Sequence, residues 1–526
     1  MRPVFAFAAA GPGNASSPNH CQQEVKRIQA FAAIGAGHAA RISKAQGSTC
    51  SQANDPVPPP TTPPTRRPFA SNYVGFSIEV PSAADMIGKA PQPIRTPFAT
   101  LVKQLHHSDK QDPTLIRVGG NSADESVWNP DGQRLPPQYH VEYNITQLDL
   151  ASYRRFGDAL GGTAAFVLDL SFIRGDDPSW PAAQVAAIGA GIGWDHIHAV
   201  SIGNEIDLFA RIGLRPENYT YDESKAEWEL YAKALYAAGL PASSIRGATW
   251  CCFGETFDAA AFGDLAASFR DQLLDMSYHR YPLSHCDGHS TTLADLLQAH
   301  ASTGQAAMMQ PFADAAHAAG LPFVIGESNS VACGGQDEVS NVLGASLWAV
   351  DYLLAMSTTG ARTVNFHGGP RGYYAAIQFS SSAPGTPPTV QPLFYAMRVI
   401  AEVTANSSQM LALETVESSN PQVRVWALAQ GDAQVFVVVH KDPGAAGAAA
   451  VSASRSDSGG QAQGRLAVLS APGGVTAKDG LSWAGQTWDG SQDGMPLGQR
   501  STSAVPGDAG TYTFQVDPGT VAVLWT

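Results

Sequence analysis

The sequence predicts an α/β protein, a (β/α)8 barrel (TIM barrel) followed by a C-terminal antiparallel β-sandwich domain. Between residues 70 and about 400, short apolar runs alternate with alanine- and leucine-rich stretches of helical periodicity. Eight such runs can be counted, and eight strands alternating with helices favour a closed barrel over an open sheet. Beyond residue 400 the runs are separated by Gly, Asp, Ser and Pro, and helical periodicity nearly disappears, which is typical of a sandwich.

The predicted elements follow from these patterns. The barrel strands are expected at residues 73–80, 115–119, 164–170, 197–202, 244–250, 276–281, 322–325 and 362–366. Helical patterns lie between them, most clearly at 225–238, 293–301, 311–319 and 341–357. The sandwich strands are expected at 423–427, 433–440, 465–469, 511–515 and 521–526.

The chain therefore divides into three predicted parts. Residues 1–69 form an N-terminal segment, a candidate for disorder, that closes in a proline-rich linker unable to form a helix or a central strand. Residues 70–400 form the barrel and residues 401–526 the sandwich. We expect the sandwich to pack against the barrel, and only Trp483 and Trp488 suggest an exposed aromatic platform for a glycan.

Composition excludes several kinds of partner. The chain has 526 residues, of which 15% are charged, and a formal net charge of −14. The low content of charged residues and the negative net charge argue against nucleic acid and against densely sulfated polysaccharide as partners, because both bind through clustered Lys and Arg. No run of about 18 apolar residues is present, so we expect no membrane-spanning helix. Adjacent Cys251 and Cys252 lack the spacer of a zinc-binding pair, and we expect neither a metal ion nor another cofactor.

Four Asn-X-Ser/Thr tripeptides bear on localisation. They begin at Asn14, Asn144, Asn218 and Asn406. Such tripeptides favour a secreted, extracellular glycoprotein, and we expect it to be monomeric. The apolar stretch at residues 4–10 is short for a secretory signal, so no clear signal peptide is identified.

Two glutamates carry the chemistry. Glu205 follows the apolar run 197–202, and Glu327 follows the run 322–325, each directly after a glycine or a Gly-Asn pair. Because catalytic groups of a barrel lie where its strands end, we expect both carboxylates in one cleft. Glycosidic bond hydrolysis needs such a pair, with one protonated carboxyl as acid and one ionised carboxylate as nucleophile. The alternative is that each glutamate makes only local hydrogen bonds.

Other polar groups follow the predicted strands. Asn204 is placed to direct its amide to a sugar 2-hydroxyl, and Tyr281 is placed to donate a hydrogen bond that keeps Glu327 ionised. The backbone of Gly334 and Gly335 offers a small anion nest, with an ordinary turn as the alternative. Candidate donors to a substrate that carries a carboxylate are Gly334, Gly335, Tyr373, Tyr374, Arg280 and Arg371.

Cys286 and Cys333 follow the sixth and seventh predicted strands. These strands are neighbours in a barrel, so their loops emerge side by side. A disulfide between the two cysteines would fix the loop after Glu327; two unpaired buried thiols are the alternative.

Five motifs carry a resemblance to a known family. They are Tyr73-Val74-Gly75-Phe76-Ser77-Ile78-Glu79, Ile116-Arg117-Val118-Gly119-Gly120-Asn121-Ser122, Gly203-Asn204-Glu205, Gly326-Glu327-Ser328-Asn329-Ser330 and Asn365-Phe366-His367-Gly368-Gly369. Over residues 70–526 the chain resembles glycoside hydrolase family 79, in particular its β-glucuronidase branch; heparanases are also members. The resemblance implies a retaining mechanism with Glu205 as acid/base and Glu327 as nucleophile. It further implies sugar contacts at Glu79, Asn121, Asn204, Tyr281 and Tyr374.

We therefore expect a retaining exo-β-glucuronidase that removes terminal glucuronate or 4-O-methylglucuronate from glycans by double displacement. One alternative is another retaining barrel glycosidase, a β-xylosidase or β-glucosidase, with the same two glutamates. A heparanase-like endo-glucuronidase is disfavoured by the negative net charge and the lack of clustered basic residues. A noncatalytic glycan-binding protein is the alternative from another class, and the presence of both carboxylates argues against it.

Overall fold

The structure is a computed structural model. It describes residue 70 and residues 72–526, except for 107–111, 254–255, 406–408, 412–415, 419–421, 431–432 and 455–462. The predicted N-terminal segment 1–69, with Cys21 and Cys50, lies outside the described residues, and so do the tripeptides at Asn14 and Asn406.

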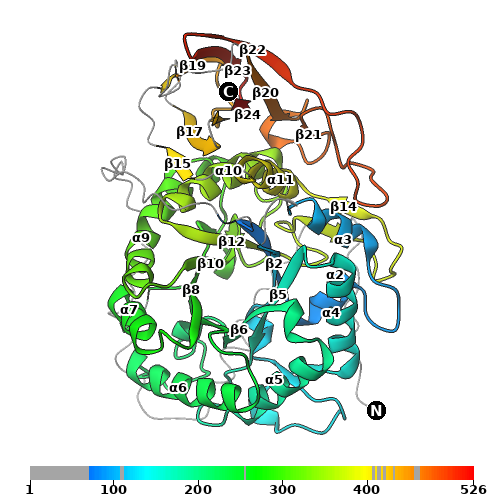
Figure 1. Ribbon diagram of the computed structural model, residues 1–526, viewed down its shortest axis with the longest axis vertical. Coiled ribbons are helices and arrows are strands. Elements are labelled where there is room, and N and C mark those ends of the chain that lie inside the picture. The colour runs from blue at the N-terminus through cyan, green and yellow to red at the C-terminus, as the bar shows by residue number, and fades with distance from the viewer. Residues whose placement is uncertain are drawn as a thin grey trace. The chain divides into compact units, whose positions relative to one another are not determined.

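Eight parallel strands close into a barrel, and Figure 1 shows them as an inner ring surrounded by helices. Each of the eight predicted runs corresponds to one strand, which confirms the predicted barrel. Around the ring the order is β1, β12, β10, β8, β7, β6, β5 and β2. The bounds are β1 Val74–Glu79, β2 Thr114–Gly119, β5 Ala164–Leu170, β6 Ile197–Ile202, β7 Ile245–Trp250, β8 Leu273–Arg280, β10 Phe323–Ser328 and β12 Ala361–His367.

The barrel strands are nearly continuous apolar runs because both of their faces are covered. Every residue of β2, β5 and β10 is buried. Helices cover the outer face of the ring. The helices of this part of the chain, including the short α8 in a projecting loop, are α2 Val80–Ile87, α3 Thr96–Lys103, α4 Gln147–Leu160, α5 Ser179–Gly191, α6 Tyr221–Ala237, α7 Ala259–Ser268, α8 Leu293–Leu296, α9 Thr303–Ala318, α10 Leu343–Thr358 and α11 Pro392–Thr404.

Two predicted helices differ from the structure. The helix predicted at 311–319 begins earlier, at Thr303, so that Pro311 lies inside α9. A proline favours a helix start, but the buried face continues upstream of it through Ala306 and Met309, and that burial keeps the earlier turns helical. The pattern at 293–301 is split into the short α8 and a 3-10 turn, Ala299–Ala301.

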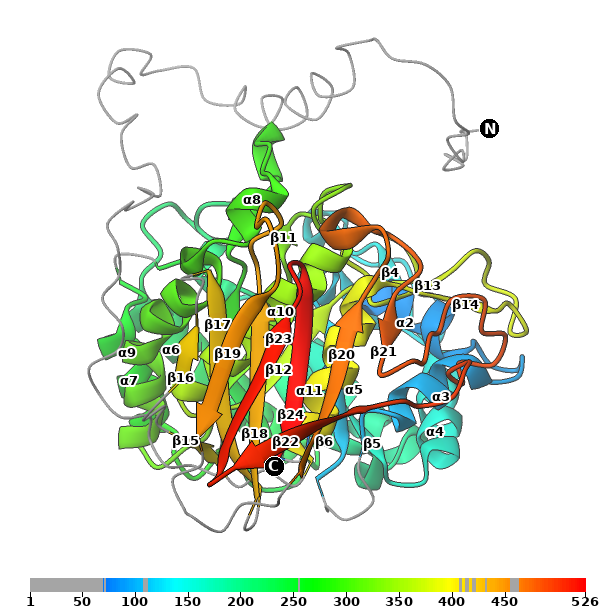
Figure 2. The same cartoon turned by 90° about the horizontal axis from the view of Figure 1, so that it is seen from above.

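The C-terminal strands form the two antiparallel layers of a sandwich, as the sequence predicts. Strand β22 joins the layers, because it pairs with β20 in one and with β23 in the other. Figure 2 shows the long strands of this domain with α10 and α11 behind them. The bounds are β15 Gln409–Leu411, β16 Val416–Ser418, β17 Val423–Gln430, β18 Ala433–His440, β19 Ala449–Ser454, β20 Gln463–Ser470, β21 Ser482–Trp483, β22 Ser503–Asp508, β23 Thr511–Val516 and β24 Thr520–Trp525. The predicted boundary at residue 400 lies inside α11.

Trp483 and Trp488 do not form an exposed platform, so that expectation was wrong. Both side chains are buried, with exposed fractions of 0% and 1%. The ring of Trp488 meets those of Tyr395 and Phe394 of α11 at centroid distances of 5.1 and 5.5 Å. Trp483 Nε1 donates to Glu402 of α11 at 3.1 Å, so both tryptophans attach the sandwich domain to this helix.

A buried charge cluster also joins the two domains. Asp351 of α10 is fully buried and accepts hydrogen bonds from Lys441 Nζ at 2.5 Å and Trp426 Nε1 at 2.9 Å, both of the sandwich. Ser302 Oγ of the barrel donates to the same carboxylate at 2.6 Å. Because α10 is buried along nearly its whole length, its sequence is apolar all round, and Asp351 is the exception that binds the sandwich.

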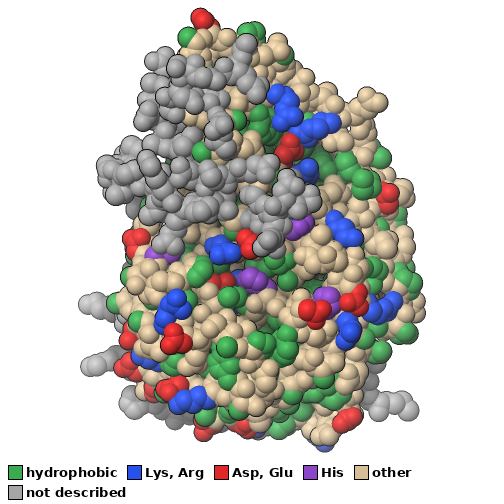
Figure 3. Space-filling model, in the orientation of Figure 1, with side chains coloured by type: hydrophobic (Ala, Val, Ile, Leu, Met, Phe, Trp, Pro, Cys, Tyr) green, Lys and Arg blue, Asp and Glu red, His purple; other side chains and the backbone are tan. Residues whose placement is uncertain are grey.

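The described surface carries charges of both signs. On the face in Figure 3, Lys and Arg are interspersed with Asp and Glu, and the described residues there form no continuous basic area. In the described part of the chain, no helix is long and apolar enough to cross a membrane. Asn144 and Asn218 are both exposed, as glycan acceptors must be.

Candidate active site

The structure brings Glu205 and Glu327 together at the C-terminal ends of β6 and β10. A carboxylate oxygen of each, together with a ring nitrogen of His279, lies within 4.8 Å of the others. Glu327 is the fifth residue of β10, because that strand continues past its predicted end at residue 325. Its pairing with β8 shifts register between Ile325 and Glu327, and this irregularity accompanies the placement of Glu327 beside Glu205.

Glu205 is held in an unusual backbone conformation directly after β6. Its φ of 52° is left-handed, which is uncommon for residues other than glycine. Its backbone N–H donates to Thr249 O of β7 at 2.9 Å, and its Oε1 lies 3.0 Å from His279 Nδ1. Burial and the neighbouring Glu327 carboxylate raise the pKa of Glu205 to about 8. At neutral pH this carboxyl group is therefore suited to give up a proton.

Glu327 has the opposite environment. Tyr281 donates a hydrogen bond to Glu327 Oε1 at 2.7 Å, as the sequence suggests, and Arg117 donates to Oε2. His367 Nδ1 lies 3.5 Å from Oε2. Burial opposes ionisation, but the positive charges of His367 and Arg117 outweigh it and hold the pKa of Glu327 well below its usual range. Glu327 is therefore an ionised carboxylate.

The neighbouring histidines differ in charge. Burial and the nearby Arg117 lower the pKa of His279 to about 3, so the imidazole beside Glu205 is neutral. Burial also disfavours a charge on His367, but the carboxylates of Glu327 and Glu79 outweigh it and raise the pKa of His367. One histidine thus accompanies a protonated carboxyl group, and the other neutralises an ionised one.

Arg117 connects most of this site, and it is absent from the predicted site residues. Its guanidinium donates to Glu327, to Asp169, to Asn204 Oδ1 at 2.6 Å and to Ser77 Oγ at 2.8 Å. The signal that could have identified it is a charged residue inside an apolar run, residues 115–118. Asp169 interrupts the run of β5 in the same way.

Two predicted site residues, Asn204 after β6 and Asn121 after β2, contact each other. Asn204 Nδ2 donates to Asn121 Oδ1 at 3.1 Å. The backbone N–H of Asn204 donates to Asp124 Oδ2 at 3.0 Å. Burial raises the pKa of Asp124 to about 7. These contacts fix the orientation of the Asn204 amide next to Glu205.

Glu79 lies at the end of β1, three strands around the barrel from β6. Its Oε2 accepts hydrogen bonds from the backbone N–H of Ser122 at 3.0 Å and from the Ser122 hydroxyl. His367 Nε2 lies 3.3 Å from its Oε1. Burial raises the pKa of Glu79, but His367 outweighs this effect and the pKa is lowered. Glu79 is thus an ionised acceptor within reach of the same histidine as Glu327.

The residues expected to bind a uronate are only partly brought together. Tyr374 is 8% exposed, and its ring stacks with that of Tyr281 at a centroid distance of 6.4 Å. Gly334 O accepts from the N–H of Tyr373, and Gly335 N–H donates to Val331 O at 3.2 Å. Because the Gly335 N–H is engaged within its own loop, the predicted two-glycine anion nest is not available as a pair.

The two arginines expected to bind a uronate, Arg280 and Arg371, have different surroundings. Arg280 donates from Nε to Gln305 Oε1 at 2.5 Å and lies 5.0 Å from the Phe253 ring centroid. It follows Tyr278 and His279 on β8, and its guanidinium donates to Gln305 and Met308, both of α9. Arg371 is exposed in the loop after β12.

Two disulfides lie in the loops beside the site. Cys286 and Cys333 form the predicted disulfide, which connects the loop after β8 to the loop after Glu327. Cys251 and Cys252 form a second one between adjacent residues, which the sequence analysis does not anticipate. The backbone N–H groups of both donate to Asp207, at distances between 2.8 and 3.2 Å. Burial raises the pKa of Asp207 to about 7, and the nearby Glu205 adds to the shift.

The side chains of Glu205, His279 and Glu327 are close enough to share a cation. Arg117 already supplies a positive charge to Glu327, and the imidazole of His279 faces Glu205. The donor set is therefore organised for a proton and a guanidinium.

Comparison with known proteins agrees with the predicted resemblance. Residues 425–523 match the model of the glycosyl hydrolase family 79 C-terminal beta domain. The chain is 26% identical over 360 residues to a β-glucuronidase of Neurospora crassa and 25% identical over 342 residues to one of Aspergillus niger. These alignments cover 62% and 59% of this chain, and the chain spans 62% and 61% of the length of the two relatives. The predicted likeness to glycoside hydrolase family 79 is thereby confirmed.

Solved structures share the fold. A 4-O-α-L-rhamnosyl-β-D-glucuronidase from Fusarium oxysporum 12S matches with a TM-score of 0.69 at 17% identity, over 89% of this chain and 98% of that one. A family 51 arabinofuranosidase from Xanthomonas axonopodis pv. citri matches with a TM-score of 0.61 at 13% identity, over 88% and 97%. At these identities the matches establish the barrel with its C-terminal sandwich.

Proposed function

We propose that this protein is a retaining β-glucuronidase that releases terminal glucuronate or 4-O-methylglucuronate from glycans. The observation that carries the proposal is the pair Glu205 and Glu327, with oxygens within 4.8 Å and pKa values shifted in opposite directions. Retaining glycosidases place their two carboxyl groups about 5–5.5 Å apart, and inverting ones leave room for a water at about 6.5–9.5 Å. The separation supports retention.

In the first step, the ionised Glu327 attacks the anomeric carbon. The bond from that carbon to the leaving oxygen breaks, and Glu205 gives its proton to this oxygen. The hydrogen bond from Tyr281 and the charge of Arg117 keep Glu327 ionised beforehand. The Asn204 amide, fixed by Asp124 and Asn121, is placed to bind the sugar 2-hydroxyl.

In the second step, Glu205 acts as a base. It is now a carboxylate and takes a proton from a water molecule, which attacks the anomeric carbon and displaces Glu327. The sugar leaves with its original configuration, and Glu205 is again protonated. Because Glu205 must hold a proton in one step and accept one in the next, a pKa near the working pH serves both.

The glucuronide preference is proposed from the two β-glucuronidase relatives and from the tyrosines near Glu327. A uronate carboxylate loses water on entering the site and needs hydrogen-bond donors in exchange. Tyr374 supplies a hydroxyl group at a buried position next to Tyr281, whose own hydroxyl is donated to Glu327. A neutral glycoside would leave the Tyr374 hydroxyl without a charged acceptor.

The test is a set of 4-nitrophenyl β-glycosides: glucuronide, glucoside, xyloside and galactoside. We expect kcat/KM for the glucuronide to exceed the others by at least about tenfold. Equal or faster hydrolysis of the glucoside or xyloside would assign the protein to a neutral glycosidase instead. Failure to cleave any of them, or a first product with inverted configuration in proton NMR, would overturn the proposal.

A further inference from the structure

The guanidinium of Arg117 lies between two carboxylates on different strands. Nη1 donates to Glu327 of β10, and Nη2 donates to Asp169 of β5. Arg117 is 0% exposed and Asp169 is 3% exposed. The proposed nucleophile therefore shares this buried cation with a second carboxylate that has no assigned part in the reaction.

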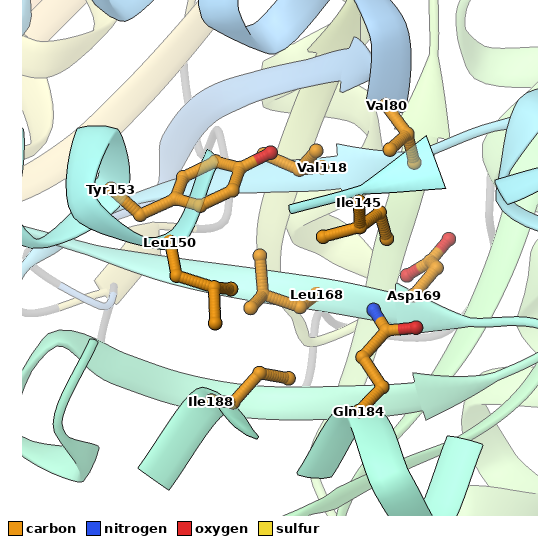
Figure 4. A pocket seen from close by; sticks show the side chains of 9 residues that line it. All are labelled: Val80, Val118, Ile145, Leu150, Tyr153, Leu168, Asp169, Gln184 and Ile188. Carbon is orange, nitrogen blue, oxygen red and sulfur yellow. The ribbon is translucent and has the colours of Figure 1, made fainter. Parts of the chain in front are cut away.

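The position of Asp169 is tightly determined. A Cβ atom at Gly119 of the neighbouring β2 would come within 2.0 Å of Asp169 Oδ2, so a glycine is required there. The other oxygen, Oδ1, is buried and has no hydrogen-bond partner among the described residues. Figure 4 shows Asp169 next to Gln184 at one end of a cavity of about 20 Å³, which has room for about one water molecule.

A second buried pair in the barrel shows what a structural ion pair looks like here. Arg246 of β7 donates twice to Asp275 of β8, with both distances 2.8 Å. Both residues lie near the beginnings of their strands, at the end of the barrel away from Glu205. That guanidinium makes no contact with the candidate site, whereas the guanidinium held by Asp169 also binds Glu327 and Asn204.

We propose that Asp169 is a positioning residue of the active site, which orients Arg117 toward Glu327 and Asn204 and limits the positive charge that the nucleophile experiences. This inference rests on the proposed function. A carboxylate paired with an uncompensated guanidinium is stabilised as an anion and attacks carbon less readily. With Asp169 in place, Arg117 holds Glu327 by a directional hydrogen bond. The guanidinium and its two carboxylate partners together then keep a net negative charge.

The positive charge of Arg117 also acts on Glu205. The charged and titratable groups that face Glu205 come from several elements: Glu79, Arg117, Asp207, Tyr278, His279, Tyr281, Glu327 and His367. Arg117 lowers the pKa of Glu205, against burial and Glu327, which raise it. Removing the negative charge of Asp169 leaves Arg117 less compensated. The pKa of Glu205 then falls, and activity is lost at a lower pH on the alkaline side.

The experiment compares Asp169→Asn and Asp169→Ala with Asp275→Asn. For Asp169→Asn we expect kcat/KM on 4-nitrophenyl β-glucuronide to fall by about tenfold to a hundredfold, with the alkaline limb of its pH profile moved to lower pH. For Asp169→Ala, which also loses the hydrogen bond from Arg117, we expect kcat/KM to fall further. Asp275→Asn removes the same kind of buried partner, and we expect it to lower Tm without moving the pH profile.

Unchanged kcat/KM and an unchanged alkaline limb in Asp169→Asn would overturn the inference, and so would an equal shift in Asp275→Asn. A crystal structure of Asp169→Ala gives a readout that is independent of activity. We expect the Arg117 guanidinium to move away from Glu327 in that variant, and an unmoved guanidinium would overturn the positioning role. Wild-type protein that cleaves no glucuronide would instead refute the proposed function, while the structural comparison still decides the role of Asp169.

Discussion

Glu205 and Glu327 present carboxylate oxygens within 4.8 Å of each other, and each lies against a histidine of different charge. His279, beside Glu205, has a lowered pKa, and His367, beside Glu327, has a raised one. Two carboxyl groups this close cannot both ionise without repulsion, so the surroundings decide which one keeps its proton. Here burial protonates Glu205, and Arg117 with His367 ionises Glu327.

Replacing the nucleophile should abolish turnover. We expect Glu327→Ala to lower kcat on 4-nitrophenyl β-glucuronide by on the order of 10⁴-fold or more, because no other described group is placed to attack the anomeric carbon. The exposed Glu338 in the following loop provides the matched control, and Glu338→Ala should keep wild-type kinetics. Activity retained in Glu327→Ala would remove this residue from the mechanism.

Replacing the acid/base should have an effect that depends on the leaving group. Glu205→Ala should keep more of its turnover on 4-nitrophenyl β-glucuronide, whose leaving group needs no proton, than on an alkyl glucuronide. The alkyl substrate depends on general acid catalysis, which contributes about 10²- to 10⁴-fold. Azide should partly restore turnover and give a β-glucuronosyl azide, which chromatography and NMR identify. An α-azide, or equal losses on both substrates, would contradict the assignment.

Activity should fall on the alkaline side as Glu205 loses its proton. The pKa of Glu205 is raised to about 8, so kcat/KM should decline as pH rises through that region. Glu327 has a lowered pKa and remains ionised through the acid range in which the protein is folded. In Glu205→Gln the alkaline decline should disappear together with most of the activity; a decline that persists there would be due to another group.

Tyr374 should contribute to the choice of a uronate over a neutral sugar. Loss of one hydrogen bond to a charged group removes about 1.5–3 kcal/mol, or roughly tenfold to a hundredfold in specificity. We expect Tyr374→Phe to narrow the ratio of glucuronide to glucoside kcat/KM by this factor, chiefly by lowering the glucuronide value. The exposed Tyr373 next to it offers a control, and a larger effect of Tyr373→Phe would place uronate binding at the neighbouring ring.

Asp351 should hold the sandwich to the barrel. Asp351→Ala leaves the ammonium of Lys441 buried without its partner, and we expect it to destabilise the protein by about 3–5 kcal/mol, measured by calorimetry or urea unfolding. Replacing both partners, with Asp351→Leu and Lys441→Met, should recover much of the loss because no unpaired charge remains. A double variant as unstable as Asp351→Ala would show that packing, and not the buried charge, dominates at this position.

The barrel, the sandwich and the meeting of the two glutamates could be predicted from local patterns in the sequence. Apolar runs that end in a carboxylate are a local signal, and the barrel brings the ends of all its strands to one face. Glu205 and Glu327 could therefore be expected to meet, although 122 positions separate their numbers in the chain. The pairing of Cys286 with Cys333 follows from the same rule, since neighbouring strands have neighbouring loops.

Tertiary structure alone decided how those glutamates are supported. Arg117 and Asp169 stand in the sequence as isolated charges within apolar strands. The sequence does not reveal that the guanidinium of Arg117 joins β2 to β5, to β10 and to Asn204 after β6. Trp483 and Trp488 could equally have been exposed or buried, because an aromatic residue carries no local mark of which surface covers it. The protonation state of each carboxyl group depends on its burial and on charged groups from other strands. The sequence therefore predicts where the two carboxyl groups lie, and only the folded arrangement decides which one keeps its proton.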